Sequence, residues 1–204
     1  MRRSLLIGFP LLLVLVLGGI LLTTRASQSS GLPAKLAGTD VWPPGTRPAP
    51  NFALRDQAGR TITRASLRHH VSVITFFDSR CTKACPVGGR DLGTALRDLG
   101  PHPAVSILVI SVAPQHDSPA SERHFMKTAR IHSQWHWLSG TTSQLRPVWN
   151  RYGIWVQNTP ADILHTAVAY LVDQTGDVRV ADAMPFIPLQ LAESIRFLLL
   201  HPSK

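Results

Sequence analysis

The chain has 204 residues, which is enough for one domain plus an anchor and too few for two ordinary domains. Its apolar fraction of 44% is near the norm for globular proteins, which excludes a chain that is disordered or fibrous throughout. The formal charge of +9 comes from Lys and Arg residues scattered singly, without the basic runs interleaved with aromatics that are typical of nucleic-acid binding, so we expect no nucleic-acid partner.

The first segment is an uncharged, apolar stretch from Leu5 to about Thr24 that follows Arg2 and Arg3. Its length allows a helix to cross the hydrocarbon layer of a bilayer, with the two arginines on the cytoplasmic side. A cleaved signal peptide is the alternative, but its apolar region is usually shorter and Ala26 ends a poor cleavage site. We therefore expect a transmembrane anchor over residues 1–25, and on either interpretation the rest of the chain lies outside the cytoplasm.

Residues 26–49 are rich in Ser, Gly and Pro. A segment of this composition buries little apolar surface and is typical of a tether. We therefore expect a linker over residues 26–49 and the folded domain over residues 50–204.

The patterns in the folded part predict a series of strands and helices. In chain order they are a hairpin of residues 51–54 and 61–63, a strand at 71–77, a helix at 86–99, a strand at 106–112, a helix at 118–132, a short strand at 135–138, a short helix at 143–152, a hairpin of 167–172 and 178–181, and a helix at 188–200. The strand at 71–77 is apolar on both faces, which is typical of a central strand covered on two sides. This order predicts an α/β fold, a thioredoxin-like mixed sheet flanked by helices.

The two cysteines of the chain, Cys81 and Cys85, lie just after the predicted central strand and at the start of a helix. A disulfide over so short a loop would constrain the unfolded chain very little, so structural stapling is a weak explanation for the pair. The helix N-terminus favours thiolates, and Arg80 and Lys83 add positive charge nearby, so we expect lowered pKa values for these thiols. Such thiols are better metal ligands and better exchange nucleophiles.

The spacing of the cysteines bears on which chemistry they perform. Thioredoxin-type oxidoreductases have two residues between their cysteines, whereas this chain has three. Three residues permit a disulfide in a non-helical loop, and they also let both sulfurs converge on one ion. Two thiolates with one imidazole suit copper(I), while zinc needs a fourth ligand. The residues alone leave a metal site, a redox pair and an incidental spacing open.

Three segments resemble the Sco/SenC copper-chaperone family, over residues from about 50 to 200. Residues 77–86, with the sequence FDSRCTKACP, resemble the CxxxCP site of that family. Residues 162–173 resemble its segment with a distant histidine before a strand that ends in an Asp-x-x-Gly turn, and residues 111–119 resemble its strand-to-helix segment. The resemblance implies a thioredoxin-like domain on an N-terminal anchor.

The resemblance also implies a copper ion held by Cys81, Cys85 and His165. The expected function is a membrane-anchored chaperone that delivers copper to the copper centre of cytochrome c oxidase subunit II. The expected place is the inner (cytoplasmic) membrane, spanned once, with the soluble domain on the periplasmic or extracytoplasmic side. The alternative is a thiol-disulfide oxidoreductase that reduces cysteines of that subunit or of another exported client. A peroxidase is disfavoured, because it would use one activated cysteine rather than a proline-flanked pair.

The sequence departs from the family pattern at several positions. Thr82 and Lys83 stand where the family commonly has Pro and an acidic residue, and Ala113 replaces the first of two aspartates, which leaves Asp117. These changes spare the three expected ligands but alter the shape and charge of the loop.

Most of the other histidines and methionines have simpler interpretations than metal binding. We expect His69, His70, His116 and His124 at the surface, and no ion shared by His132 and His136, because a helix ends between them. The single residues Met126 and Met184 favour core packing over a copper site.

Overall fold

The structure is a computed structural model that describes residues 35–203 except 102, 133 and 161. The predicted anchor over residues 1–25 lies outside the described residues, as does the first part of the predicted linker. Over the range that the structure describes, no helix is both long enough and apolar enough to cross a membrane.

The described chain forms ten strands, four α-helices and one short 3-10 helix. In chain order they are β1 (Asp40–Val41), β2 (Ala53–Arg55), β3 (Thr61–Thr63), η1 (Arg64–Leu67), β4 (Val71–Phe77), α2 (Ala84–Asp98), β5 (Val105–Ser111), α3 (Pro119–Thr128), β6 (Trp135–Leu138), α4 (Thr142–Arg151), β7 (Val156–Asn158), β8 (Ile163–His165), β9 (Val168–Val172), β10 (Val178–Ala183) and α5 (Pro188–Leu200).

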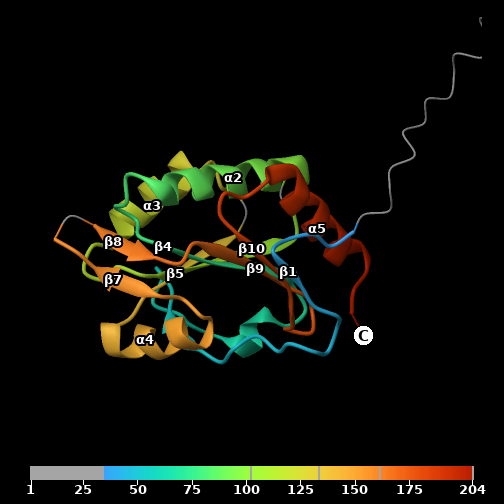
Figure 1. The fold of residues 1–204 in the computed structure, drawn as a ribbon, viewed down its shortest axis with the longest axis horizontal. Helices are drawn as coiled ribbons and strands as arrows, with labels where there is room; N and C mark the ends of the chain where they lie inside the picture. Colours follow the sequence, from blue (N-terminus) through green and yellow to red (C-terminus); the bar gives the residue numbers. More distant parts are fainter. Residues whose placement is uncertain (1–34, 102, 133, 161, 204) are drawn as a thin grey trace, which may run out of the picture. The chain divides into compact units, whose positions relative to one another are not determined.

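The central feature is a six-stranded mixed sheet in the order β1-β10-β9-β4-β5-β6 (Figure 1). Strands β4, β5 and β6 run parallel, whereas β9, β10 and β1 are antiparallel to their neighbours. All seven residues of β4 are buried, as the sequence predicts for a central strand covered on both faces. Because β4 and β5 are parallel, the segments that follow them meet at one edge of the sheet.

Helices cover both faces of the sheet and bury two apolar cores. Helices α2, α3 and α5 lie on one face, and α4 lies on the other together with the β2–β3 hairpin (Figure 1). Alternate residues of β4 point to opposite cores: Val73 contributes to the first and Ile74 to the second. This architecture confirms the predicted mixed α/β fold, with a thioredoxin-like order of elements.

The described part of the predicted linker, residues 35–49, is largely exposed but contacts the folded domain at several points. Strand β1 pairs with β10 at the sheet edge, and the Trp42 amide donates to the Arg179 carbonyl oxygen at 3.0 Å. Ala49 is 1% exposed. These residues belong to the same compact unit as the rest of the described chain. Local composition does not predict the pairing of β1, because its partner strand β10 is about 140 residues away in the sequence.

Other element boundaries differ by a few residues. Helix α2 begins at Ala84 rather than at residue 86, and α3 ends at Thr128 rather than near 132. The β7–β8 hairpin has no counterpart in the predicted elements, because its exposed residues do not alternate in polarity.

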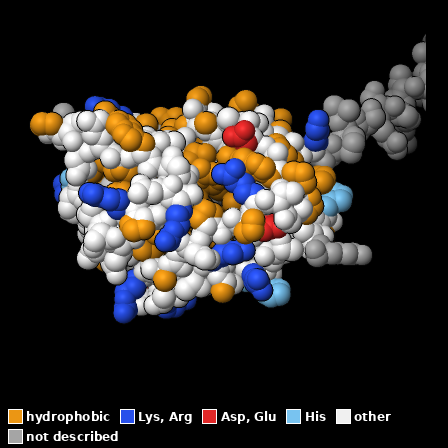
Figure 2. Space-filling view, turned by 60° about the horizontal axis from the view of Figure 1, so that its bottom comes forward, with side chains coloured by type: hydrophobic (Ala, Val, Ile, Leu, Met, Phe, Trp, Pro, Cys, Tyr) orange, Lys and Arg blue, Asp and Glu red, His pale blue; other side chains and the backbone are white. Residues whose placement is uncertain are grey.

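Basic side chains occur at several separate places on the surface. In Figure 2 the Lys and Arg side chains are spread over the face shown and are separated by uncharged and hydrophobic side chains.

Candidate metal and redox site

The two cysteines lie on either side of a loop-to-helix boundary. Cys81 belongs to the loop after β4 and is partly exposed, whereas Cys85 lies in the first turn of α2 and is 2% exposed. Both cysteines are free thiols. The N-cap residue of α2, Lys83, makes no side-chain cap, so the amides of the first turn are available to a nearby anion.

Two aspartates hold the loop that leads to Cys81. The carboxylate of Asp78 accepts the Arg80 amide at 2.8 Å and lies 3.2 Å from Nδ1 of His116. The carboxylate of Asp117 accepts the Ser79 amide at 3.0 Å and the indole N–H of Trp137 at 2.9 Å. The ends of the parallel strands β4 and β5 are thus tied together directly beside the cysteines.

His165 is brought to the cysteines by the β7–β8 hairpin. It is the last residue of β8, and its Nε2 lies 3.4 Å from Sγ of Cys85. Its Nδ1 lies 2.9 Å from the carbonyl oxygen of Thr166, which only accepts, so the neutral ring carries its proton on Nδ1. The lone pair of Nε2 therefore points toward Cys85, which is the tautomer that a metal ligand needs.

Cys81, Cys85 and His165 line one cavity of about 180 Å³. Within the described residues, no three His, Cys, Asp or Glu side chains are arranged as they stand to hold an ion. The structure thus brings the three predicted ligands to one cavity, and binding would require their side chains to move closer. Their role as ligands stays a prediction.

The two thiols have opposite pKa shifts. A hydrogen bond from the Cys85 thiol is the main cause that lowers the pKa of Cys81 to about 6, and the backbone amides of Cys85 and Lys83 lower it further against the effect of burial. The pKa of Cys85 is raised, first by its hydrogen bond to Cys81 and then by burial. The expectation of a lowered pKa is thus confirmed for Cys81 and wrong for Cys85, because the helix start cannot stabilise two adjacent thiolates equally.

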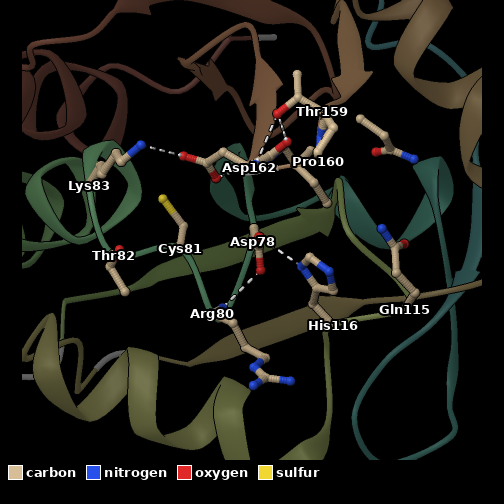
Figure 3. Close-up of a pocket in the computed structure, with 12 residues that line it drawn as sticks. Asp78, Arg80, Cys81, Thr82, Lys83, Gln115, His116, Thr159, Pro160 and Asp162 are labelled. Atoms are coloured by element: carbon tan, nitrogen blue, oxygen red, sulfur yellow. Dashed lines mark hydrogen bonds and ion pairs between the residues drawn. The ribbon is translucent and has the colours of Figure 1, made fainter.

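A second, wider cavity of about 450 Å³ opens on the other side of Cys81 (Figure 3). In this view the Cys81 sulfur points toward Asp162, whereas the Arg80 guanidinium is directed away from it. Lys83 and Asp162 form an ion pair at 3.2 Å across the cavity, which joins the cysteine loop to the segment that leads into β8. The negative charge of Asp162 raises the pKa of Cys81, so this carboxylate limits how far that pKa falls.

The sequence analysis missed the interaction between Asp78 and His116. His116 lies at the surface as expected, with its side chain 41% exposed, but its ring also contacts the buried carboxyl group of Asp78. The position of both residues in the sequence could have indicated this contact. Each follows a buried strand, and the segments after neighbouring parallel strands meet at one edge of the sheet. His136 lies on β6 and contacts Asp56 at 3.1 Å. It shares no helix with His132, as the sequence predicts.

A profile of the SCO1/SenC family matches residues 43–197 of this chain. The SCO2-like protein RP587 of Rickettsia prowazekii (strain Madrid E) is 27% identical over 133 residues, which are 61% of this chain and 64% of that protein. The match therefore spans just under two thirds of that relative's length.

Solved structures with copper bound are similar to this chain. Bradyrhizobium japonicum ScoI with copper bound is 26% identical with a TM-score of 0.64, over 74% of this chain and 98% of that one. Yeast Sco1 with copper bound is 22% identical with a TM-score of 0.65, over 77% of this chain and 91% of that one, a likeness of fold.

The fold and the site define a thioredoxin-like domain with a paired-cysteine centre and a histidine beside it. The profile match covers most of the chain, and the resemblance in the sequence is confirmed. The chain belongs to the SCO1/SenC family.

Proposed function

We propose that this protein is a membrane-anchored, copper-binding chaperone that delivers copper to a respiratory oxidase. The observation that carries the proposal is the shared cavity in which Nε2 of His165 lies 3.4 Å from Sγ of Cys85, with Cys81 beside them. The two thiolate sulfurs are soft donors and the imidazole is a borderline donor, and both kinds suit copper(I). The donor set therefore fits copper. The copper-bound relatives support this choice of metal.

Copper is the cargo in this proposal, and the residues act on it by binding and release. Cys81 is already largely a thiolate at neutral pH, because its pKa is about 6. Cys85 would release its thiol proton when copper binds, since the metal ligand is the thiolate. His165 needs no proton transfer, because Nδ1 holds the ring proton on the Thr166 side. Delivery would then proceed by exchange of these ligands for the thiolates of an acceptor.

The acceptor and the location are parts of the same proposal. We propose the copper centre of cytochrome c oxidase subunit II as acceptor. The predicted anchor over residues 1–25 would hold the protein in the inner (cytoplasmic) membrane, with the folded domain on the periplasmic or extracytoplasmic side. The apolar stretch after Arg2 and Arg3 supports this orientation.

A thiol-disulfide reductase is the second candidate, and the asymmetry of the two thiols favours it. The Cys81 thiolate would attack a client disulfide, release one client thiolate and form a mixed disulfide. Cys85, once deprotonated, would then attack Sγ of Cys81, release the second client thiolate and leave a Cys81–Cys85 disulfide. A measured potential close to those of strongly reducing dithiols would support this function, and a strongly oxidising value would contradict it.

The test of the copper proposal is a copper(I) titration of the full chain in detergent, under anaerobic conditions and against a chromophoric chelator. We expect one equivalent to bind, and we expect His165→Ala to weaken binding by roughly tenfold or more while thiol alkylation continues. The matched control is His124→Ala, an exposed histidine that lines a neighbouring cavity with Cys81. Unchanged affinity in His165→Ala would remove this residue from the ligand set.

A further inference from the structure

Met184 lines the same cavity as Cys81, Cys85 and His165. It follows β10 directly, and its amide donates to the Ala167 carbonyl oxygen at 3.0 Å. The backbone of Met184 is therefore fixed next to the segment that carries His165.

The side chain of Met184 lies against the first part of α2. A Cβ atom placed on Gly88 would be 2.5 Å from the Met184 sulfur, so the sulfur occupies space that this glycine leaves free. Gly88 is one turn after Cys85, and residues three apart on a helix lie on the same side. The thioether sulfur thus lies along the side of the helix that carries the Cys85 thiol.

The two internal methionines of the chain have different surroundings. Met126 is 2% exposed within the core between the sheet and α3, as expected for a methionine that only fills space. Met184 is half-buried at the edge of the same core, where it meets the cavity of the paired cysteines. The sequence-based interpretation as packing residues therefore agrees with the core contacts of both methionines, and Met184 in addition meets the cavity of the paired cysteines.

We propose that the Met184 thioether is a fourth donor at this site and makes it selective for copper(I) over zinc. The inference rests on the proposed function, because it assumes that Cys81, Cys85 and His165 bind the ion. Thioether sulfur is a soft donor that suits copper(I), whereas protein zinc sites use Cys, His and carboxylate ligands. A thioether carries no proton, so its contribution does not change with pH.

Selenomethionine labelling provides a direct test. The chain has three methionines, so full-length labelled protein in detergent carries selenium at positions 1, 126 and 184. After loading with one equivalent of copper(I), X-ray absorption at the copper edge should show a copper–selenium scattering path. That path should be absent in Met184→Leu, which keeps the bulk of the side chain, and present in Met126→Leu, the matched control from the core.

Affinities provide the second measurement. We expect Met184→Leu to weaken copper(I) binding by about tenfold and to leave zinc(II) binding unchanged, while Met126→Leu changes neither. If the labelled wild-type protein binds copper(I) but shows no copper–selenium path, and Met184→Leu binds copper(I) as tightly as wild type, the role of Met184 is overturned and the copper proposal stays intact. Wild-type protein that binds no copper(I) would overturn both. Equal losses of zinc and copper affinity in Met184→Leu would indicate a packing role and overturn the selectivity.

Discussion

Lys83 Nζ lies 3.2 Å from Asp162 Oδ2, so an ion pair connects the loop of the cysteines to the hairpin of His165. The Lys83 side chain is 74% exposed, and this ion pair also lowers the pKa of Asp162. Lys83 stands where the family commonly has an acidic residue. The departure therefore gives this chain a contact between the two segments that carry the expected ligands.

We expect Lys83→Gln to weaken copper(I) binding only slightly, by no more than about threefold, because exposed ion pairs contribute little. The difference should shrink at high salt, which screens the pair. Chelator competition at low and at high ionic strength measures both effects, with the exposed Lys127→Gln on α3 as control. If the loss of copper(I) affinity in Lys83→Gln is the same at low and at high salt, Lys83 does not act through its ion pair with Asp162.

The second prediction concerns the Cys81 thiol. Because the hydrogen bond from Cys85 is the main cause that lowers the pKa of Cys81 to about 6, Cys85→Ala should raise that pKa. The rate of alkylation by iodoacetamide against pH measures it, since only the thiolate reacts. In wild-type protein the rate should reach half its maximum near pH 6, and in Cys85→Ala the midpoint should move to higher pH. Cys81→Ser is the control and should react slowly, because Cys85 is 2% exposed and burial still raises the pKa of its thiol when the hydrogen bond to Cys81 is lost. An unchanged midpoint in Cys85→Ala would show that the backbone amides alone stabilise the thiolate.

Hydrophobic patterning predicts the central elements of the fold. The other elements depend on pairing between segments that are distant in the sequence, so local patterns do not predict them. The bounds of β4, β6 and α5 agree with the predicted strands and helix, because each is a run of residues with a clear burial pattern. Strand β1 has only two residues, both exposed, and forms because β10 offers a free edge. No local pattern encodes such a strand.

The same limit applies to the site. Cys81 and Cys85 were evident from their place after a buried strand. The role of His165 is predicted only through the family resemblance, because a single histidine carries no spacing signal. The hairpin that brings it to Cys85 consists of short, partly exposed strands. The sequence favours core packing for Met184, a single methionine, and its place at the cavity could not be predicted because it depends on the end of β10 and on the space beside Gly88.

The third prediction concerns Glu122, a carboxyl group of α3 that is 5% exposed and has one oxygen without a partner. Burial, and then the charge of Asp117, raise its pKa from 4.5 to about 7. The folded state therefore holds more protons than the unfolded state between these two values. The stability from this group is fully present below about pH 4.5 and is lost as the pH rises through about 7.

We expect this loss to be roughly 1–3 kcal/mol in the free energy of unfolding of the full chain. Urea denaturation at pH 5 and pH 8, followed by tryptophan fluorescence, measures it. Glu122→Gln should flatten the pH dependence, whereas Glu193→Gln, at the surface of α5, should retain it. Equal slopes in wild type and Glu122→Gln would assign the pH dependence to other groups.

The last prediction concerns the contact between α2 and α3 behind the cysteines. A Cβ atom on Gly93 would lie 1.9 Å from the carbonyl oxygen of Ala129, a backbone atom that cannot move aside without shifting the segment after α3. Alanine is favoured over glycine in a helix by about 1 kcal/mol, but overpacking of a buried contact costs about 1–3 kcal/mol or more. We therefore expect Gly93→Ala to lower the free energy of unfolding.

Gly88→Ala is the matched control, because it makes the same change five residues earlier against the flexible Met184 side chain. It should cost less, because a thioether can rotate away where a peptide carbonyl cannot. Urea denaturation of both variants decides the point: equal stabilities would mean that α3 shifts to accept the methyl group, and that the close approach of the two helices does not require glycine.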